Sequence, residues 1–154
     1  MIAWLLTSCR EAALPPAQLE QRIVGCWRLI AAPGMASDPV AYSTFRTFEL
    51  ASSSYTAARP DIHRATIGRP LGEGEGTFWQ VAGEPAEVYL AVLWIEGGWS
   101  LHLRPTSDHV DTLEGPASYA NPAMAIADSV ASLGTVRAIR RACPSSKASS
   151  PPAP

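Results

Sequence analysis

Positive charge is scarce in this sequence, and so is charge of either sign. Asp, Glu, Lys and Arg make up 17% of the 154 residues, and the twelve basic residues include a single lysine, Lys147. The formal net charge is -2, and the sequence contains no run of basic residues. Binding to nucleic acid or to an anionic membrane surface needs such positive charge, so we expect neither.

Long apolar runs and catalytic motifs are also absent from the sequence. No segment approaches the roughly 18 apolar residues of a membrane-spanning helix. There is no G-x-S-x-G nucleophile elbow. The stretch Gly72–Gly76 (GEGEG) is not followed by the lysine of a phosphate-binding loop, and we expect Glu73 and Glu75 to be solvated. We therefore expect a binding or scaffold role rather than catalysis, with no cofactor and no metal site.

The length and composition predict one globular domain between two non-globular ends. Hydrophobic residues make up 47% of the chain, and a chain of roughly 150 residues can bury a stable core. We place this domain at residues 19–143. Residues 1–18 read as a signal-like apolar segment with a Pro-containing tether, and the Ser/Pro-rich residues 144–154 predict a disordered tail.

Short segments of alternating polarity, separated by turn residues, predict a mainly antiparallel β domain. In Trp99–Arg104 every second side chain is apolar, whereas Ala86–Ile95 is apolar on both faces and should be central. Loops are expected at Met35–Tyr42 and Gly68–Gly76. The expected strands span residues 23–30, 43–50, 54–58, 62–67, 77–81, 86–95, 99–104, 109–113 and 135–142.

One helix is predicted near the C-terminus, between the last two expected strands. Asn121 is a good N-cap, Pro122 suits the first helical position, and Ala123–Leu133 contains no helix breaker. Gly134 then supplies a C-terminal stop. We therefore expect this helix to end at Leu133, directly before the last strand.

The expected order of eight strands, a helix and a ninth strand resembles that of the lipocalins and their calycin relatives. Gly25-Cys26-Trp27 is similar to the G-x-W motif on the first strand of that family. The resemblance implies a small antiparallel up-and-down β-barrel that holds a small apolar ligand. It also implies that Trp27 closes the barrel floor and that a basic side chain from late in the chain, Arg140 or Arg141, packs on its indole.

Four tryptophans are candidates for lining a ligand cavity in such a barrel: Trp27, Trp79, Trp94 and Trp99. Inward-facing aromatic side chains at one end of a barrel can line a cavity and desolvate an apolar ligand. In the alternative interpretation, the same side chains fill a compact core and leave no cavity. The sequence leaves both interpretations open.

The three cysteines bear on the compartment in which the protein works. Leu6–Cys9 (LTSC), at the end of the apolar N-terminus, resembles the lipobox of bacterial lipoprotein signal peptides. The resemblance implies export and acylation of Cys9, whereas the alternative is a short apolar end with an incidental cysteine. If Cys9 carries lipid, Cys26 and Cys143 remain as an even pair that an oxidising compartment allows to form a disulfide. Otherwise all three are reduced thiols of a cytoplasmic protein.

Two hypotheses for the function follow from these observations. The first is an exported bacterial protein, extracytoplasmic and lipid-anchored if Cys9 is acylated, that binds a small hydrophobic or amphipathic molecule. Its contact with a membrane would then be through the lipid alone. The second is a protein of the cell envelope with a filled core, which binds another protein through an exposed apolar patch. The sequence specifies neither the ligand nor the oligomeric state.

The lipobox hypothesis predicts the mass of the mature protein. In protein isolated from its native source, residues 1–8 should be missing and Cys9 should carry lipid. Alkylation without reductant should leave Cys26 and Cys143 unmodified, because an oxidising compartment allows them to be joined. Intact-mass spectrometry with and without reductant checks both points. An intact Met1 together with three alkylated thiols would contradict export.

Overall fold

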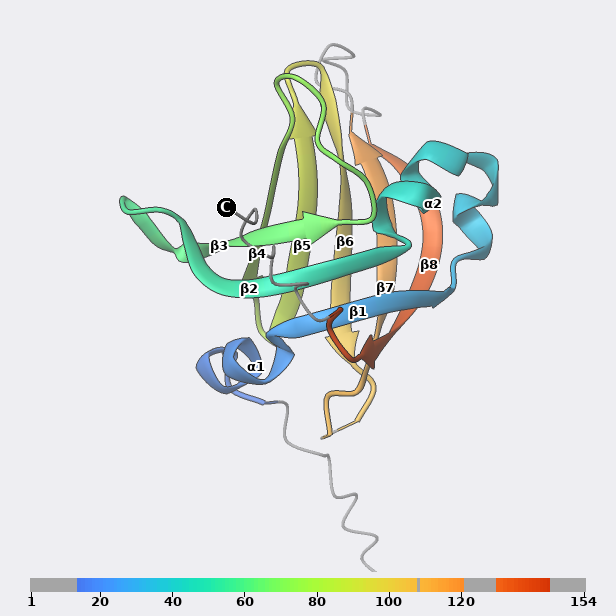
Figure 1. Ribbon diagram of the computed structural model, residues 1–154. Coiled ribbons are helices and arrows are strands. Elements are labelled where there is room, and N and C mark those ends of the chain that lie inside the picture. The colour runs from blue at the N-terminus through green and yellow to red at the C-terminus, as the bar shows by residue number, and fades with distance from the viewer. Residues whose placement is uncertain (1–13, 108, 121–129, 145–154) are drawn as a thin grey trace, which may run out of the picture.

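The computed structural model describes residues 14–107, 109–120 and 130–144, and these residues form a closed antiparallel β-barrel (Figure 1). Each strand pairs with the next along the chain, and β1 pairs with β8 to close the barrel. The strands are β1 (Gly25–Ala31), β2 (Thr47–Thr56), β3 (Arg59–Ile67), β4 (Gly76–Ala82), β5 (Glu87–Trp94), β6 (Gly97–Pro105), β7 (Thr112–Ala120) and β8 (Val130–Arg141). The predicted mainly β, up-and-down barrel is therefore confirmed.

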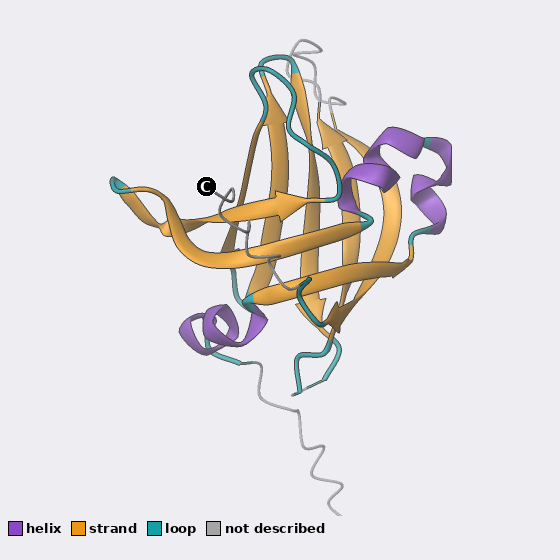
Figure 2. Cartoon of the chain, in the orientation of Figure 1, coloured by secondary structure: helices purple, strands orange, loops and turns teal. Residues whose placement is uncertain are grey.

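The helices of the described chain are short and lie in its N-terminal part (Figure 2). Helix α1 (Pro16–Ile23) lies at one end of the barrel, which we call the floor. The opposite end, which carries the β3–β4 and β5–β6 connections, is the mouth. A 3-10 helix, η1 (Pro33–Ser37), and α2 (Pro39–Phe45) connect β1 to β2. None of the helices in the described ranges has the length and hydropathy needed to cross a membrane.

Several element boundaries differ from the prediction. The expected strands 43–50 and 54–58 largely merge into one strand, β2. The first residues of the range 43–50 belong instead to the end of α2. The barrel therefore has eight strands and not nine. The expected loop Met35–Tyr42 contains helical turns from η1 and α2. The expected strand 109–113 begins only at Thr112, as β7. Of the predicted C-terminal helix, Val130–Leu133 belongs to β8, and residues 121–129 lie outside the described residues.

These differences have physical causes. Helix α2 begins with the capping signal that the loop prediction overlooked: the Asp38 carboxylate accepts a hydrogen bond from Ala41 N at 2.9 Å, and Pro39 takes the first helical position. At the start of β8, pairing with β7 overrides local helix propensity, because Val130 lies opposite Ala120 and Ala131 opposite Tyr119. Such pairing is not visible in the local sequence.

The interior of the barrel is packed with apolar side chains. Trp27 and Trp79 are both 0% exposed, so they fill the core. Trp79 Nε1 donates a hydrogen bond to Ala51 O at 2.9 Å. It thereby links β4 to β2, across the place where β3 and β4 are joined by a short ladder. Other fully buried side chains of the interior are Leu50, Val88, Leu90, Val92, Leu101, Leu103 and Leu113.

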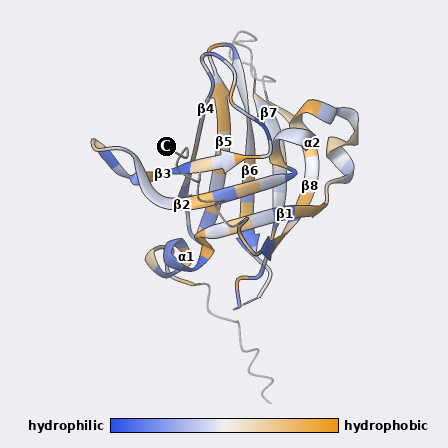
Figure 3. Cartoon of the chain, in the orientation of Figure 1, coloured by the Kyte–Doolittle hydropathy of each residue, from blue (hydrophilic) through white to orange (hydrophobic). Residues whose placement is uncertain are grey.

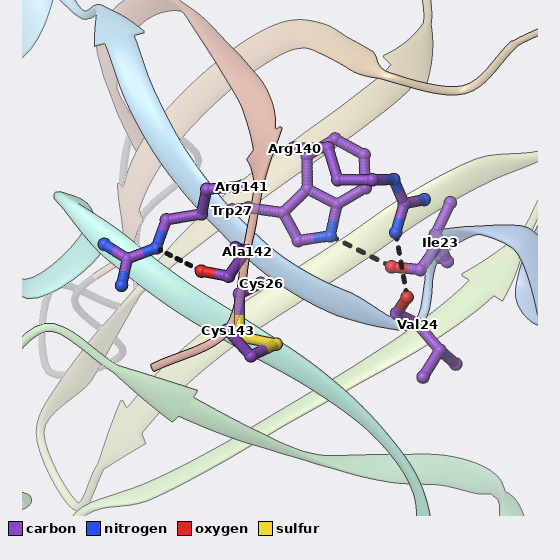
Figure 4. The surroundings of a disulfide bond; sticks show 8 residues. All are labelled: Ile23, Val24, Cys26, Trp27, Arg140, Arg141, Ala142 and Cys143. Atoms are coloured by element: carbon purple, nitrogen blue, oxygen red, sulfur yellow. Dashed lines mark hydrogen bonds between the residues drawn. A yellow bond between two sulfur atoms is a disulfide. The ribbon is translucent and has the colours of Figure 1, made fainter. Parts of the chain in front are cut away.

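At the floor, Arg140 packs on the indole of Trp27, as the family resemblance implied (Figure 4). The guanidinium carbon lies 4.6 Å from the centre of the ring. Trp27 Nε1 donates to Ile23 O, and Arg140 Nη1 donates to Val24 O, each at 2.9 Å. Gly25 has φ 134°, and a Cβ at this position would lie 3.0 Å from Arg140 Nη1. Glycine is therefore needed here both for its backbone conformation and for the space that Arg140 occupies.

Arg140 also holds the β6–β7 connection. Its Nη2 donates to Arg22 O and to Val110 O, the latter at 3.3 Å, and its Nε lies 3.5 Å from Asp111 Oδ1. Val110 is buried and has φ 53°, a left-handed conformation that β-branched residues rarely adopt. Its neighbours must therefore keep it in place. One side chain thus joins β8 to β1, to the end of α1 and to this strained connection.

A disulfide joins Cys26 on β1 to Cys143, which follows β8 (Figure 4). These are the two cysteines that the sequence left as an even pair. Their Cα atoms are 5.1 Å apart, and they are separated by 117 residues in the chain. Since β1 and β8 already pair, the bond covalently secures the seam that closes the barrel. In the chain-entropy description, a loop of this length stabilises the fold by about 4–5 kcal/mol.

The contacts of Arg140 predict a large cost for removing its charge. Arg140→Met should lower the free energy of unfolding by about 2–3 kcal/mol, because the carbonyls of Val24 and Val110 lose their donor. Arg141→Met is the matched control, since the Arg141 guanidinium hydrogen-bonds only the adjacent carbonyl of Ala142 among the described residues. It should change stability by less than about 0.5 kcal/mol. Urea unfolding checks both, and equal losses would contradict this role of Arg140.

Candidate functional site at the mouth of the barrel

The mouth carries an open depression between α2, the β3–β4 connection and the ends of β5 and β6. Its volume is about 320 Å³, which is at the small end of the range for ligand sites. The lining combines aromatic, apolar and charged side chains, a mixture suited to an amphipathic molecule. The lining residues are Val40, Arg69, Gly72, Glu73, Glu75, Trp94 and Trp99.

Two of the four predicted tryptophans form the aromatic part of this depression. Trp94 and Trp99 lie with their ring centres 4.6 Å apart at an angle of 63°, an edge-to-face arrangement that aromatic pairs prefer. Tyr119 of β7 extends the group, at 6.1 Å from Trp94 and 6.5 Å from Trp99. Strand register explains the grouping, because Trp99 lies between Val92 and Tyr119. Side chains two residues apart on a strand share a face, so Trp94 points the same way as Val92.

The other two predicted tryptophans do not reach the depression. Trp27 packs with Phe48 near the floor, at 6.5 Å between ring centres, and Trp79 lies 4.5 Å from the ring of His63. Both indoles are fully buried, whereas Trp94 is partly exposed. Trp27 and Trp79 therefore fill the core and do not line the depression. Trp94 and Trp99 are the pair in contact with open space.

Helix α2 is attached to the rim of the mouth by polar and apolar contacts. Asp38, which caps this helix, also accepts a hydrogen bond from Trp99 Nε1 at 3.2 Å. Met35, Ala41 and Phe45 are fully buried beneath η1 and α2. A Cβ at Gly34 would lie 1.9 Å from Leu133 O of β8, so only glycine allows η1 to approach the barrel this closely.

The loop between β3 and β4 is held by an ion pair and is not simply a solvated turn. Arg69 Nη1 and Nη2 donate to the Glu75 carboxylate at 2.6 and 2.7 Å, and Arg69 Nε donates to Thr44 Oγ1 at 2.9 Å. Gly72 N donates to the same carboxylate at 2.6 Å. The Arg69 guanidinium also lies 6.0 Å from the centre of the Trp99 ring. The expectation that Glu75 is solvated is therefore wrong, whereas Glu73 is exposed as expected.

The ion pair lowers the pKa of Glu75 to about 2, first through the hydrogen bonds from Arg69 and then through the N–H of Gly72. The carboxylate therefore stays ionised well below neutral pH. Sequence reasoning missed Arg69, Glu75 and the capping residue Asp38 as members of this site. Only Asp38-Pro39, a capping residue before a proline, carried a local signal.

The pKa of Glu75 predicts a pH-dependent contribution to stability. Because the pKa is lower in the folded chain than its ordinary 4.5, the ionised pair stabilises the fold fully above that pH. The contribution is lost as the pH falls through about 2. Glu75→Gln should cost about 1 kcal/mol at pH 7, and the difference from the unaltered protein should shrink toward pH 2.

Urea unfolding at several pH values between 7 and 2.5 measures this effect. Glu73→Gln provides the control, because Glu73 lines the same depression and makes no hydrogen bond or ion pair with the described residues. Its stability should follow that of the unaltered protein at each pH. A loss in Glu75→Gln that is constant across this range would contradict the assigned ion pair.

Comparisons with protein-family models, with curated proteins and with solved structures found no match to this chain. The closed eight-stranded antiparallel barrel is compatible with a lipocalin-like fold. Membership of that family and the lipobox at Leu6–Cys9 stay predictions, and Cys9 lies outside the described residues.

Proposed function

We propose that this chain is an exported binding protein that holds a small amphipathic molecule at the mouth of its barrel. The observation that carries the proposal is the depression lined by Trp94 and Trp99 above a packed interior. A ligand at the mouth needs no rearrangement of the core. The barrel then acts as a rigid support for a site built on its rim.

The lining divides the site into an apolar and a polar side. Trp94, Trp99 and Val40 would cover the apolar part of a ligand, and burial of apolar surface is worth roughly 25 cal/mol per Å². Arg69, Glu73 and Glu75 would face its polar end. The ion pair and the cap of α2 fix the rim before binding, which reduces the entropy that a ligand must overcome.

Export is supported by the disulfide, since such bonds persist in oxidising compartments and are rare in the cytosol. Acylation of Cys9 would anchor the exported protein to a membrane. The described chain begins at Leu14, directly before α1 at the floor. An anchor at Cys9 would therefore attach to the floor end and leave the mouth facing away from the membrane.

A second function is favoured by exposed apolar side chains around the mouth. Ile95, in the β5–β6 turn, is 91% exposed. Figure 3 shows hydrophobic segments along β5 and in α2. Such a rim also fits a protein-binding surface, with the filled core serving as a scaffold. Exposed apolar residues of the described chain at this end include Val40, Tyr42, Leu71, Leu93, Ile95 and Val130.

Probe binding tests the proposed function. The neutral fluorophore N-phenyl-1-naphthylamine should bind the folded protein, and Trp94→Ala should weaken its binding about tenfold because an aromatic wall of the site is lost. Tyr89→Ala is the control, since Tyr89 is an aromatic residue of β5 that does not line the depression. Its affinity for the probe should stay unchanged.

The outcomes separate the two functions. Binding that depends on Trp94 supports a small-molecule site at the mouth. Absence of binding at high micromolar probe would overturn it and leave protein binding through the apolar rim. Equal weakening by Trp94→Ala and Tyr89→Ala would mean that the effect is not specific to the mouth. Circular dichroism of each variant verifies that the barrel is folded.

A further inference from the structure

We infer that the site at the mouth selects molecules with a cationic head group, namely organic ammonium ions that carry an apolar substituent. This inference rests on the proposed function and names the chemical class of its ligand. It is based on the charges around the depression, on the hydrogen bonds that Arg69 already makes to protein acceptors, and on the two indole rings of the lining.

The charges that line the depression are negative on balance. Arg69 and Glu75 cancel one another as an ion pair. Glu73 lines the same space, is exposed, and makes no hydrogen bond or ion pair with the described residues. Asp38, at the adjacent rim, accepts hydrogen bonds from the neutral donors Ala41 N and Trp99 Nε1 and makes no ion pair with a described residue, so it adds negative charge that the N-terminus of α2 offsets only in part. Arg46, the residue that follows α2, lies at the opposite end of the helix from Asp38 and does not line the depression.

An anionic head group would find few donors in this site. Arg69 is the one basic residue among the described residues that line it, and Arg69 already directs four hydrogen bonds to protein acceptors. These acceptors are Thr44, Pro70 and the two oxygens of Glu75. Four of the five guanidinium N–H groups are thus engaged, so an incoming carboxylate or sulfate would have one N–H of Arg69 left to bind and would meet the charge of Glu73, which pairs with no described residue. Both effects oppose anion binding.

The aromatic rings favour a cation of low hydration. The Arg69 guanidinium already lies over the ring of Trp99, so this rim holds one cation against an indole. Trp94 is partly exposed beside it and can take a second cation from solution. Indole is the best aromatic partner for cations, and quaternary ammonium groups are recognised in this way.

A metal ion fits the same space poorly. Calcium and magnesium require about six oxygen ligands, whereas Glu73 supplies the one carboxylate in the lining that is not engaged with a described residue. Val40 and the two indoles would face a hydrated ion with apolar surface. An alkylammonium ion, by contrast, places its substituent on this surface and its charge beside Glu73.

Competition against bound N-phenyl-1-naphthylamine tests the inference. Decyltrimethylammonium and decyl sulfate have the same chain length and opposite charge, and both are used below their micellar concentrations. At low ionic strength, the ammonium ion should displace the probe at about tenfold lower concentration than the sulfate. In 1 M salt the two displacing concentrations should become more similar, because salt screens the charges. Glu73→Gln should weaken the ammonium ion about three- to fivefold more than it weakens the neutral probe, whose affinity for this variant is measured in a separate titration.

Glu84→Gln is the matched control, because it removes the same charge from an exposed residue in the β4–β5 turn at the floor end. Glu84→Gln should leave the preference for decyltrimethylammonium over decyl sulfate unchanged. If the probe binds but both detergents compete equally, or Glu73→Gln has no effect, the inference is overturned and the proposed function stands. If the probe does not bind the unaltered protein, the proposed function fails and the inference fails with it.

Discussion

The contact between Arg140 and Trp27 lies where the last strand meets the first, and it holds together the elements that meet at the floor of the barrel. The guanidinium lies over the face of the indole, so the cation is attracted by the electrons of the ring and covers its apolar surface. Its remaining N–H groups fix the end of α1 and the strained Val110. The disulfide secures the same seam. With β1 and β8 in register, η1 can pack on β8 through Gly34, and this contact positions α2 at the mouth.

The floor is closed and packed whereas the mouth is open, and the positions of the tryptophans reflect this difference. Trp27 and Trp79 are surrounded on all sides, and their indole nitrogens have protein acceptors. They contribute the packing that keeps the barrel rigid. Trp94 ends β5 and Trp99 lies near the start of β6, at the rim where α2 and the β3–β4 loop leave one side open. Because the interior is filled with apolar side chains, the open depression lies at the rim and is separate from the core.

Local patterns in the sequence predicted the barrel well where they were strong. The alternation in Trp99–Arg104 and the apolar run Ala86–Ile95 correspond to β6 and β5. The helix prediction was wrong at Val130–Leu133, because pairing with distant β7 decides the conformation there. The ion pair of Arg69 with Glu75 was also missed. Its geometry depends on Thr44 and Trp99, which the chain brings together only on folding.

We propose that the mouth, and not the interior, binds the ligand. The indole N–H resonances of the tryptophans test it directly, because the four on the barrel report on the two places separately. We predict that titration with N-phenyl-1-naphthylamine shifts the signals of Trp94 and Trp99 and leaves those of Trp27 and Trp79 in place. Shifts of Trp27 and Trp79, or of none of the four, would contradict ligand binding at the mouth.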